Sequence, residues 1–362
     1  CGDVAQRDYL PEFHRLAERA ELVAVCSRRR ERAQAVAAAY QIPQVFTDYR
    51  QMLAESNADA VINLTPIQQH FATALATLQA GKHLYCEKPV AGTVAEANVL
   101  KQVAQQQGLT LVCAPCVMLF PQVRYAKTMI DSGAIGAVYS AYGYGHMGVP
   151  PWRGYTSDPT PFFAKGGGPA RDMGVYPLHT LTGILGPVKR VSALVTKVLD
   201  SFTPVDGPMA GQRIAVEAED NWQLLLDFGE GRLASLAANN IVVGSRAPQV
   251  EIHGLGGTIA LDPIDVSTPV ELLQTDKGWQ VIPPPFALNA AVGTEDAAQA
   301  AKPTGRQAGP DHHLGVEHLV DCIVAHRQPV LSIDHARHVI EIIEQAAQSA
   351  RDGVIKNIET SF

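Results

Sequence analysis

The stretch Leu84-Tyr85-Cys86-Glu87-Lys88-Pro89 joins a short apolar run to a charged pair and a proline. Similar apolar runs occupy residues 60–64 and 109–112. The segments between the runs, residues 67–79 and 93–107, are rich in Ala, Leu, Gln and Glu, which favour helix. Because strand and helix alternate, this region predicts an α/β fold with a doubly wound parallel sheet.

The same alternation begins at the start of the chain. Cys1-Gly2-Asp3-Val4-Ala5 precedes a helical segment over residues 9–19, a strand over 22–25 and a helix over 31–40. This opening matches the second half of a Gly-x-Gly-x-x-Gly/Ala turn, which binds the pyrophosphate of a dinucleotide in a Rossmann domain. We therefore expect a cofactor contact from Gly2, Asp3, Val4 and Ala5. We also expect one more strand ahead of Cys1, supplying the first glycine.

The end of the second strand indicates which dinucleotide binds. An acid there would hydrogen-bond the ribose hydroxyls and repel a 2′-phosphate, but the strand ends Cys26-Ser27-Arg28-Arg29-Arg30. Ser27 and Arg28 are suited to a 2′-phosphate, so the sequence favours NADP over NAD. The alternative is a solvated basic surface.

Beyond about residue 138 the pattern changes to longer strands separated by Gly-rich turns, which indicates a largely antiparallel sheet. The predicted strands cover residues 138–144, 188–198, 222–228, 233–243, 250–252 and 270–274, with one helix over 169–185 among them. Residues 290–309 are interpreted as a surface loop before final helices over 314–325 and 335–351. The chain then divides into a Rossmann domain, residues 1–118, and an α+β domain, residues 119–362, whose last helices are expected to pack back on the first domain.

Composition narrows the function classes. The chain has 362 residues and a formal net charge of −7, so it lacks the basic field that holds nucleic acid or an anionic membrane. No apolar run is long enough for a membrane span, and no leader pattern is visible, so we expect a cytoplasmic protein. Cys113-Ala-Pro-Cys116 lacks the second pair that a zinc site needs, and His312, His313 and His318 lack a metal-binding spacing. No metal is predicted.

Five motifs give the chain a resemblance to the glucose-fructose oxidoreductase / inositol dehydrogenase (Gfo/Idh/MocA) family. They are Cys1-Gly-Asp-Val-Ala5, Asn63-Leu-Thr-Pro66 with His70, Ala80-Gly-Lys-His83 running into Cys86-Glu-Lys-Pro89, Gly166-Gly-Gly-Pro-Ala-Arg-Asp-Met-Gly-Val-Tyr176, and the helical region 315–349. The resemblance implies an NAD(P)-dependent oxidoreductase acting on a secondary alcohol or ketone of a sugar, sugar derivative or cyclitol. It also implies a homodimer or homotetramer joined through the sheet of the second domain. Two alternatives within the family stay open: a glycosidase that retains its cofactor, and a non-enzymatic cofactor-binding regulator.

Candidate catalytic residues follow the Gly-rich segment and the strand ending at Cys86. Lys88 lies just past the carboxyl end of a parallel strand, where such folds bind ligands, and a lysine there can exchange a proton with a substrate oxygen. In one helix Asp172, Tyr176 and His179 would stand at i, i+4 and i+7 and face one way. The family commonly has His where this chain has Tyr176, so the assisting acid or base is predicted to be either Tyr176 or His179.

Further binding residues rest mainly on the resemblance. It assigns Thr65, Pro66, His70, Glu87 and Lys88 to the cofactor, and implies that the peptide before Pro89 is often cis. Lys88, Asp172 and Tyr176 are expected to contact substrate. Trp152, Arg153 and Phe163 precede or join the Gly-rich segment, where they would either stack on a sugar ring or pack in the core.

Overall fold

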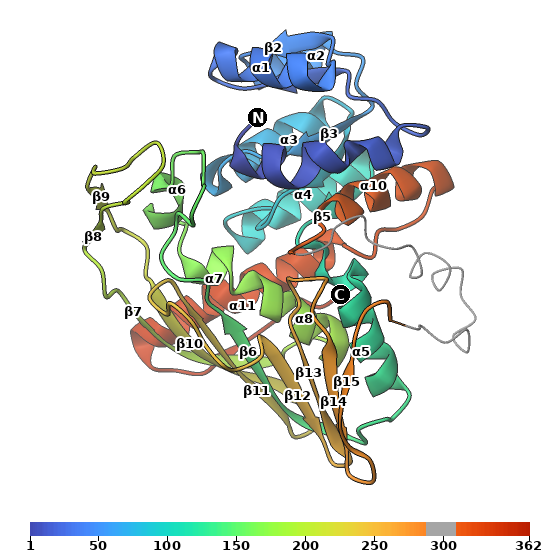
Figure 1. Cartoon of the computed structure of the whole chain (residues 1–362), viewed down its shortest axis with the longest axis vertical. Coiled ribbons are helices and arrows are strands. Elements are labelled where there is room, and N and C mark those ends of the chain that lie inside the picture. Colours follow the sequence, from blue (N-terminus) through green and yellow to red (C-terminus); the bar gives the residue numbers. More distant parts are fainter. Residues whose placement is uncertain (287–308) are drawn as a thin grey trace.

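The N-terminal domain contains the predicted parallel strands. In the computed structural model, which describes residues 1–286 and 309–362, β3 (Ala60–Asn63), β4 (His83–Cys86) and β5 (Leu111–Cys113) form one parallel sheet. β1 (Ala24–Cys26) pairs in parallel with β2 (Gln44–Phe46) in a separate two-stranded sheet, seen with α1 and α2 at the top of Figure 1. The expected strand ahead of Cys1 stays a prediction.

Helices connect these strands. They are α1 (Arg30–Tyr40), α2 (Tyr49–Glu55), α3 (His70–Gln79) and α4 (Val94–Gln106), with the short turn η3 (Ile67–Gln69) before α3. α4 opens on a capping box, in which the Thr93 hydroxyl accepts the Glu96 N–H and the Glu96 carboxylate accepts the Thr93 N–H. Such a cap stabilises a helix by about 1 kcal/mol. β2 and α2 were missed by the sequence prediction.

The segment after the glycine turn differs from the single helix predicted over residues 9–19. It forms a wide turn, η1 (Ala5–Tyr9), followed by a 3₁₀ helix, η2 (Leu10–Leu16). Pro11 explains the change, because a proline has no N–H to continue the i→i−4 ladder of an α-helix. The shift places Tyr9 in the protein interior, where only 3% of it is exposed.

The C-terminal domain contains a nine-stranded sheet in the order β15-β14-β13-β12-β6-β11-β10-β7-β16. The strands are β6 (Val138–Gly145), β7 (Arg190–Thr196), β10 (Asn221–Gly229), β11 (Arg232–Asn239), β12 (Val250–Gly254), β13 (Gly257–Leu261), β14 (Val270–Gln274), β15 (Gly278–Ile282) and β16 (Lys356–Asn357). All neighbours are antiparallel except β6 and β11. A small hairpin, β8 (Ser201–Phe202) with β9 (Ile214–Ala215), lies apart from the sheet. The predicted class, a Rossmann domain plus a mostly antiparallel α+β domain, is confirmed.

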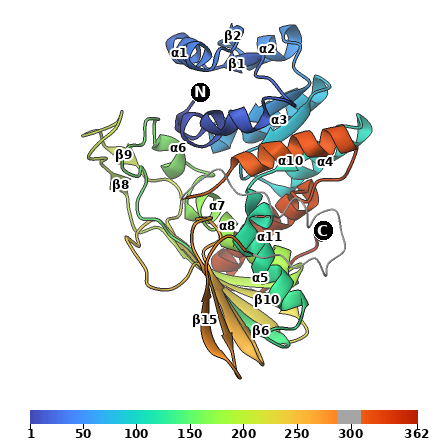
Figure 2. The same ribbon diagram turned by 45° about the vertical axis from the view of Figure 1, so that its right-hand side comes forward.

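Helices cover one face of the large sheet (Figure 2). They are α5 (Pro121–Asp131), which follows η4 (Cys116–Leu119), α8 (Val175–Leu185) and α11 (Ile333–Asp352). The helix predicted over 169–185 is broken into α7 (Pro169–Asp172) and α8, and a short α6 (Thr160–Phe163) precedes them. Gly174 at the break is tightly packed, because a Cβ there would lie 2.9 Å from the Ala238 side chain.

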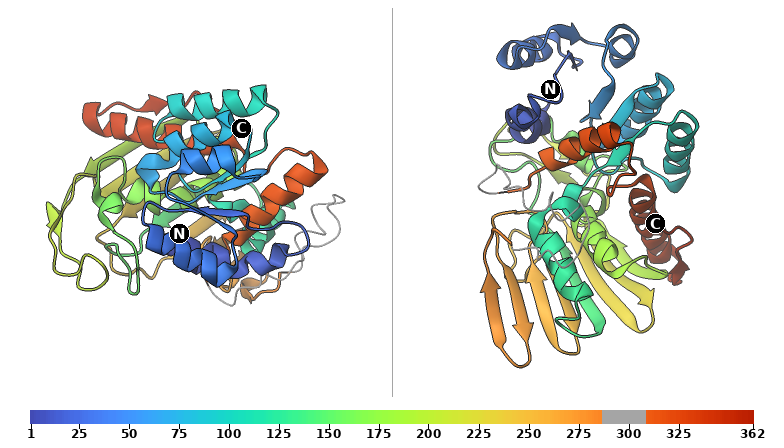
Figure 3. Two further views of the ribbon diagram at one scale, coloured as in Figure 1. Left: turned by 90° about the horizontal axis from the view of Figure 1, so that it is seen from above. Right: turned by 90° about the vertical axis from the view of Figure 1, so that its right-hand side faces the viewer.

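The last helices join the two domains (Figure 3). α10 (His313–Ala325) contacts β4 and β5, and α11 contacts both α4 and β7. Gly315 lets α10 approach β4, because a Cβ there would lie 2.4 Å from the Tyr85 ring. The loop predicted at 290–309 falls almost wholly outside the described residues. No helix within the described ranges has the length and apolar character needed to cross a membrane.

Candidate functional site

One large cavity of about 1690 Å³ lies where the two domains meet. Its walls come from the glycine turn, the carboxyl ends of β1, β3 and β4, the segment between β6 and α8, and the start of α10. Of the residues predicted for the site, the cavity is lined by Gly2, Asp3, Val4, Ala5, Ser27, Arg28, Thr65, Pro66, His70, Glu87, Lys88, Trp152, Asp172 and Tyr176. The carboxyl ends of parallel strands thus form the site, as expected for an open α/β sheet.

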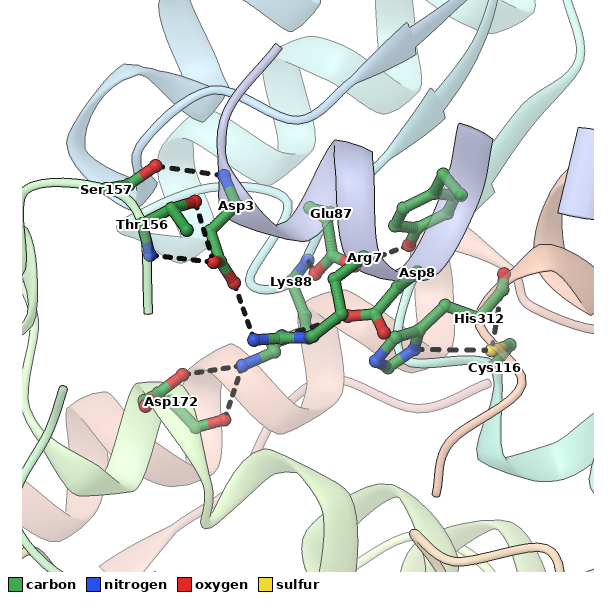
Figure 4. Close-up of polar contacts among 11 residues, drawn as sticks. Asp3, Arg7, Asp8, Glu87, Lys88, Cys116, Thr156, Ser157, Asp172 and His312 are labelled. Carbon is green, nitrogen blue, oxygen red and sulfur yellow. Dashed lines mark hydrogen bonds and ion pairs between the residues drawn. The ribbon is translucent and has the colours of Figure 1, made fainter. Parts of the chain in front are cut away.

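Lys88 and Asp172 form an ion pair across the domain boundary (Figure 4). The Lys88 Nζ donates to Asp172 Oδ1 at 2.7 Å and to the Asp172 carbonyl oxygen at 2.6 Å. The peptide between Lys88 and Pro89 is cis. Both side chains are only 12–13% exposed, so this contact is shielded from water. Lys88 therefore serves as a positively charged donor held in a fixed place.

Tyr176 lies beside this pair. The Lys88 Nζ is 5.0 Å from the centre of the Tyr176 ring, which is 5% exposed. Burial, followed by the charges of Glu87 and Asp172, raises the pKa of the Tyr176 phenol well above its usual value. The phenol consequently stays protonated near neutral pH and can donate a hydrogen bond.

The Glu87 carboxylate is held by hydrogen bonds in the wall of the cavity and is only 8% exposed. Its Oε1 accepts the Tyr9 hydroxyl at 2.5 Å, and its Oε2 accepts the Lys88 backbone N–H at 2.9 Å. Burial raises the pKa of this carboxyl, but the charges of His312 and Lys88 and the hydrogen bond from Tyr9 outweigh burial and hold the pKa below its usual value. The predicted contact of Glu87 with cofactor stays a prediction, and in the structure the carboxylate fixes the backbone of Lys88.

The glycine turn contacts a loop of the second domain. The Asp3 N–H donates to Ser157 Oγ at 2.9 Å, and Asp3 Oδ1 accepts the Thr156 N–H at 2.9 Å. Arg32 of α1 donates to the same Ser157 Oγ at 3.2 Å. A backbone N–H at a helix start and an arginine thus converge on one oxygen, an arrangement that suits a phosphate oxygen.

These residues fit a dinucleotide. Gly2, Asp3, Val4 and Ala5 of the turn all line the cavity, at the start of η1. Ser27 and Arg28 line the same cavity, together with Arg29 and Arg32. The cavity therefore offers backbone donors at the turn and a cationic region at the end of β1.

His70 links the backbone segments that follow two neighbouring strands. It is 2% exposed, its Nδ1 lies 2.7 Å from the Pro89 carbonyl oxygen, and its Nε2 lies 2.7 Å from the Thr65 carbonyl oxygen. Burial lowers the pKa of the imidazole. Both ring nitrogens face backbone carbonyls of the segments that follow β3 and β4, and since His70 also lines the cavity, its contact with cofactor stays a prediction.

Two predicted substrate residues lie elsewhere. Arg153 is exposed and does not line the cavity. Phe163 is 2% exposed and packs against Phe202, with 5.6 Å between ring centres. Its neighbour Phe162 lines the cavity instead, because successive residues of the short α6 point in different directions.

The cavity wall is nevertheless aromatic. The Phe162 ring lies 5.6 Å from that of Trp152 and 5.7 Å from that of Tyr155. All three residues line the cavity. Flat apolar surfaces of this kind suit the C–H face of a sugar or cyclitol ring.

His179 is also outside the site. It is 5% exposed and does not line the cavity, and its ring lies 4.6 Å from that of His335 in α11. Burial, followed by the nearby His335 and His338, lowers its pKa well below the usual value. The i+7 relation to Asp172 assumed one continuous helix, and the break between α7 and α8 removes that relation.

The sequence analysis did not place His312 in the cavity wall. This residue lines the cavity just before α10, with its ring stacked on Tyr9 at 5.9 Å and 6.3 Å from the Tyr176 ring. Figure 4 shows Asp8 beside it. The sequence had grouped His312 with His313 and His318, and no metal-holding group of three or more His, Cys, Asp or Glu occurs in residues 1–286 and 309–362.

Comparisons with known proteins agree with this geometry. Residues 1–114 match the model of the oxidoreductase family with an NAD-binding Rossmann fold (GFO_IDH_MocA), and residues 123–260 match the GFO/IDH/MocA C-terminal domain. D-glucoside 3-dehydrogenase of Escherichia coli (strain K12) is 32% identical over 177 residues, 48% of this chain and 49% of the relative. Trans-1,2-dihydrobenzene-1,2-diol dehydrogenase of Sus scrofa is 27% identical over 257 residues, 69% of each chain.

A solved structure shares the whole fold. Aldose-aldose oxidoreductase from Caulobacter crescentus, complexed with glycerol, has a TM-score of 0.75 and 21% identity, covering 98% of this chain and 97% of that one. By sequence, the matched part spans about half of the length of D-glucoside 3-dehydrogenase. Both domains therefore have known counterparts, and the fold extends along nearly all of the chain.

Proposed function

The chain belongs to the Gfo/Idh/MocA family of oxidoreductases, and from this premise we propose that it is an NAD(P)-dependent dehydrogenase or reductase of a sugar, sugar derivative or cyclitol. The observation that carries the proposal is the Lys88–Asp172 ion pair in the cavity that also contains the glycine turn. A nicotinamide cofactor would supply a hydride acceptor or donor there.

Residues of the chain would bind the cofactor and contact the reacting oxygen. Gly2, Asp3, Val4 and Ala5 hold the pyrophosphate, with backbone N–H groups as donors. Lys88 donates a hydrogen bond to the reacting oxygen, whose negative charge grows in the transition state, and Asp172 keeps the ammonium in place. Tyr176 adds a neutral donor on the same side.

The aromatic wall of Trp152, Tyr155 and Phe162 supports a ring-shaped polyol as substrate. The relatives named for glucoside and dihydrodiol dehydrogenation add to this support. We further propose NADP as the preferred cofactor, since Ser27, Arg28 and Arg32 line the cavity near the end of β1.

A screen of glycosides, free sugars, cyclitols and cyclic diols with both cofactors tests the proposal, with absorbance of the reduced nicotinamide as the readout. We expect turnover with at least one compound. Accumulation of free reduced cofactor argues against the cofactor-retaining glycosidase. Binding of cofactor without turnover of any compound would favour the regulator.

A further inference from the structure

The Glu87 carboxylate accepts one hydrogen bond on each of its oxygens. Its Oε2 accepts the Lys88 backbone N–H at 2.9 Å, and its Oε1 accepts the Tyr9 hydroxyl at 2.5 Å. Burial raises the pKa of this carboxyl, but the charges of His312 and Lys88 outweigh burial and hold the pKa below its usual value, so the group is ionised near neutral pH. An ionised carboxylate can only accept, and both bonds are therefore donated to Glu87.

The Tyr9 hydroxyl lies between two partners. One is Glu87 Oε1, and the other is the Tyr85 hydroxyl oxygen, 3.0 Å away. Because the single Tyr9 hydroxyl proton goes to the carboxylate, the Tyr85 hydroxyl must be the donor in the second bond. Tyr85 is fully buried and Tyr9 is 3% exposed, so water competes little for either bond. The bonds thus run in one direction, from Tyr85 through Tyr9 to Glu87.

Packing fixes the Tyr9 ring on two sides. The ring lies edge-on to that of Tyr85, with 5.8 Å between centres, and stacks on the His312 ring at 5.9 Å. The hydroxyl consequently approaches Glu87 from one direction. Tyr9 is the last residue of η1, the turn that begins at Ala5 of the glycine motif. The element expected to bind the pyrophosphate therefore also carries the group that orients Glu87.

We propose that Tyr9 is a positioning residue for Lys88 and that it acts through Glu87. This rests on the proposed function, in which the Lys88 ammonium donates to the reacting oxygen. The Tyr9 hydroxyl orients the Glu87 carboxylate, and the carboxylate fixes the backbone from which the Lys88 side chain extends. Without that hydroxyl, Glu87 Oε1 would lose its donor in a poorly solvated place, which favours reorientation of the carboxylate. The ammonium would then lose its fixed direction.

The first test is kinetic and uses Tyr9→Phe, which removes the hydroxyl and keeps the ring. The matched control is Tyr125→Phe, because Tyr125 of α5 packs on Phe286 and is not among the cavity residues. Both variants are first compared with the wild type in thermal unfolding. With the best substrate, Tyr9→Phe should lower kcat roughly 10- to 100-fold, while KM and the dissociation constant for NADPH change less than about threefold. Tyr125→Phe should change none of these. If KM and NADPH affinity suffer as much as kcat, Tyr9 has only a structural role and the inference is wrong.

A double-mutant cycle tests the route through Glu87. Glu87→Gln replaces one carboxylate oxygen by an NH₂ group, so the amide cannot accept from Tyr9 and from Lys88 together. If Tyr9 acts through Glu87, adding Tyr9→Phe to Glu87→Gln should lower kcat by less than about twofold further. An equal loss in both backgrounds would show that Tyr9 acts by another route and would overturn the inference.

Amide hydrogen exchange at the Lys88 N–H tests the contact without any substrate. Exchange should be at least about tenfold faster in Tyr9→Phe than in the wild type, because a reoriented carboxylate protects this N–H less, and it should be unchanged in Tyr125→Phe. Unchanged exchange, or a wild-type kcat, in Tyr9→Phe would overturn the inference. A wild type that is inactive with every compound would instead overturn the proposed function, and the exchange rates would still decide whether Tyr9 positions Lys88.

Discussion

The Lys88–Asp172 pair is the residue-scale feature on which catalysis should depend most. The Lys88 contact to the reacting oxygen strengthens as charge develops, so Lys88→Ala should lower kcat at least 10²-fold and leave the dissociation constant for NADPH nearly unchanged. Steady-state kinetics and fluorescence titration check this. Lys101→Ala is the matched control, because Lys101 also pairs with an aspartate, Asp334, outside the cavity. Near-full activity of Lys88→Ala would contradict the assignment.

Ser27 gives a second residue-scale prediction, about cofactor choice. Ser27→Asp places a carboxylate at the end of β1, where it would repel a 2′-phosphate and accept the ribose hydroxyls. We expect the preference to move from NADP to NAD by roughly 1–3 kcal/mol. Calorimetric titration of wild type and variant with both cofactors measures the change. Equal affinity of the wild type for NAD and NADP would remove the basis of the prediction.

Single residues were predictable from sequence where a local pattern fixed their place. Lys88 follows a buried strand, and Asp172 follows a Gly-rich segment, so both could be placed at a strand end or helix start. The place of His312 in the cavity wall could not be predicted this way, because it depends on the packing of α10 on β4. The prediction chose Phe163 rather than its neighbour Phe162, because a four-residue helix gives no periodicity that identifies which residue faces the cavity.

At the scale of elements, α8 and α11 meet through a buried histidine cluster, His179, His335 and His338. His338 Nε2 accepts the Val188 N–H at 3.0 Å, and His335 Nε2 lies 2.7 Å from the Thr182 hydroxyl oxygen. Burial, followed by nearby charge, lowers the pKa of His335 to about 3. Burial is also the main cause that lowers the pKa of His338, to about 4. The native state therefore keeps these rings neutral.

The pH dependence of stability follows from those shifts. The unfolded chain binds protons near the ordinary histidine pKa of about 6.5, whereas the folded chain does not, so acid favours unfolding. The free energy of unfolding should fall below pH 6.5, by about 2 kcal/mol per histidine at pH 5. Urea denaturation at pH 7 and pH 5 measures this. His338→Gln, whose amide oxygen can still accept the Val188 N–H, should reduce the difference, and an unchanged difference would exclude the cluster as its cause.

Elements were predicted well where the hydrophobic pattern was long. α4 with its capping box, β10 and the final helices lie close to their expected ranges. β2 and α2 were missed because a three-residue strand and a seven-residue helix carry little periodicity. The break between α7 and α8 depends on tertiary packing, since Gly174 must fit against Ala238 of β11.

At the scale of the whole molecule, one face of the nine-stranded sheet is covered by helices and the other exposes apolar side chains. Leu194, Leu225 and Leu233 are 75%, 64% and 57% exposed. We predict that two copies of the chain associate through this face, because exposing an apolar surface of this kind to water is energetically unfavourable. Light scattering at micromolar concentration should give at least a dimer.

A substitution makes the oligomer prediction sharper. Leu225→Glu places a charge in the proposed interface and should shift the mass toward the monomer. Val243→Glu changes a residue that is 92% exposed in the loop after β11 and should leave the mass unchanged. A monomeric wild type would show that the exposed sheet face has another use.

The division into two domains was visible in the sequence as a change from alternating strand and helix to successive strands. Their mutual arrangement was not, because it depends on α10, which packs on β4 and β5, and on α11, which contacts both α4 and β7. Composition and periodicity describe segments one at a time. The shared cavity arises only once those segments are assembled.

The bonds from Asp3 to Thr156 and from its N–H to Ser157 join the phosphate-binding turn to the loop that bears Tyr155 and ends at Phe162. Binding of a dinucleotide at the turn is expected to affect the conformation of that loop. Binding of a sugar ring against the loop is expected to affect the conformation of the turn. Under the proposed function we predict that the two ligands are thermodynamically linked: by whatever factor the sugar raises the affinity for dinucleotide, the dinucleotide raises the affinity for sugar. Asp3→Ala removes the oxygen that accepts the Thr156 N–H, so this variant should weaken the coupling in both directions by the same factor while each ligand alone still binds.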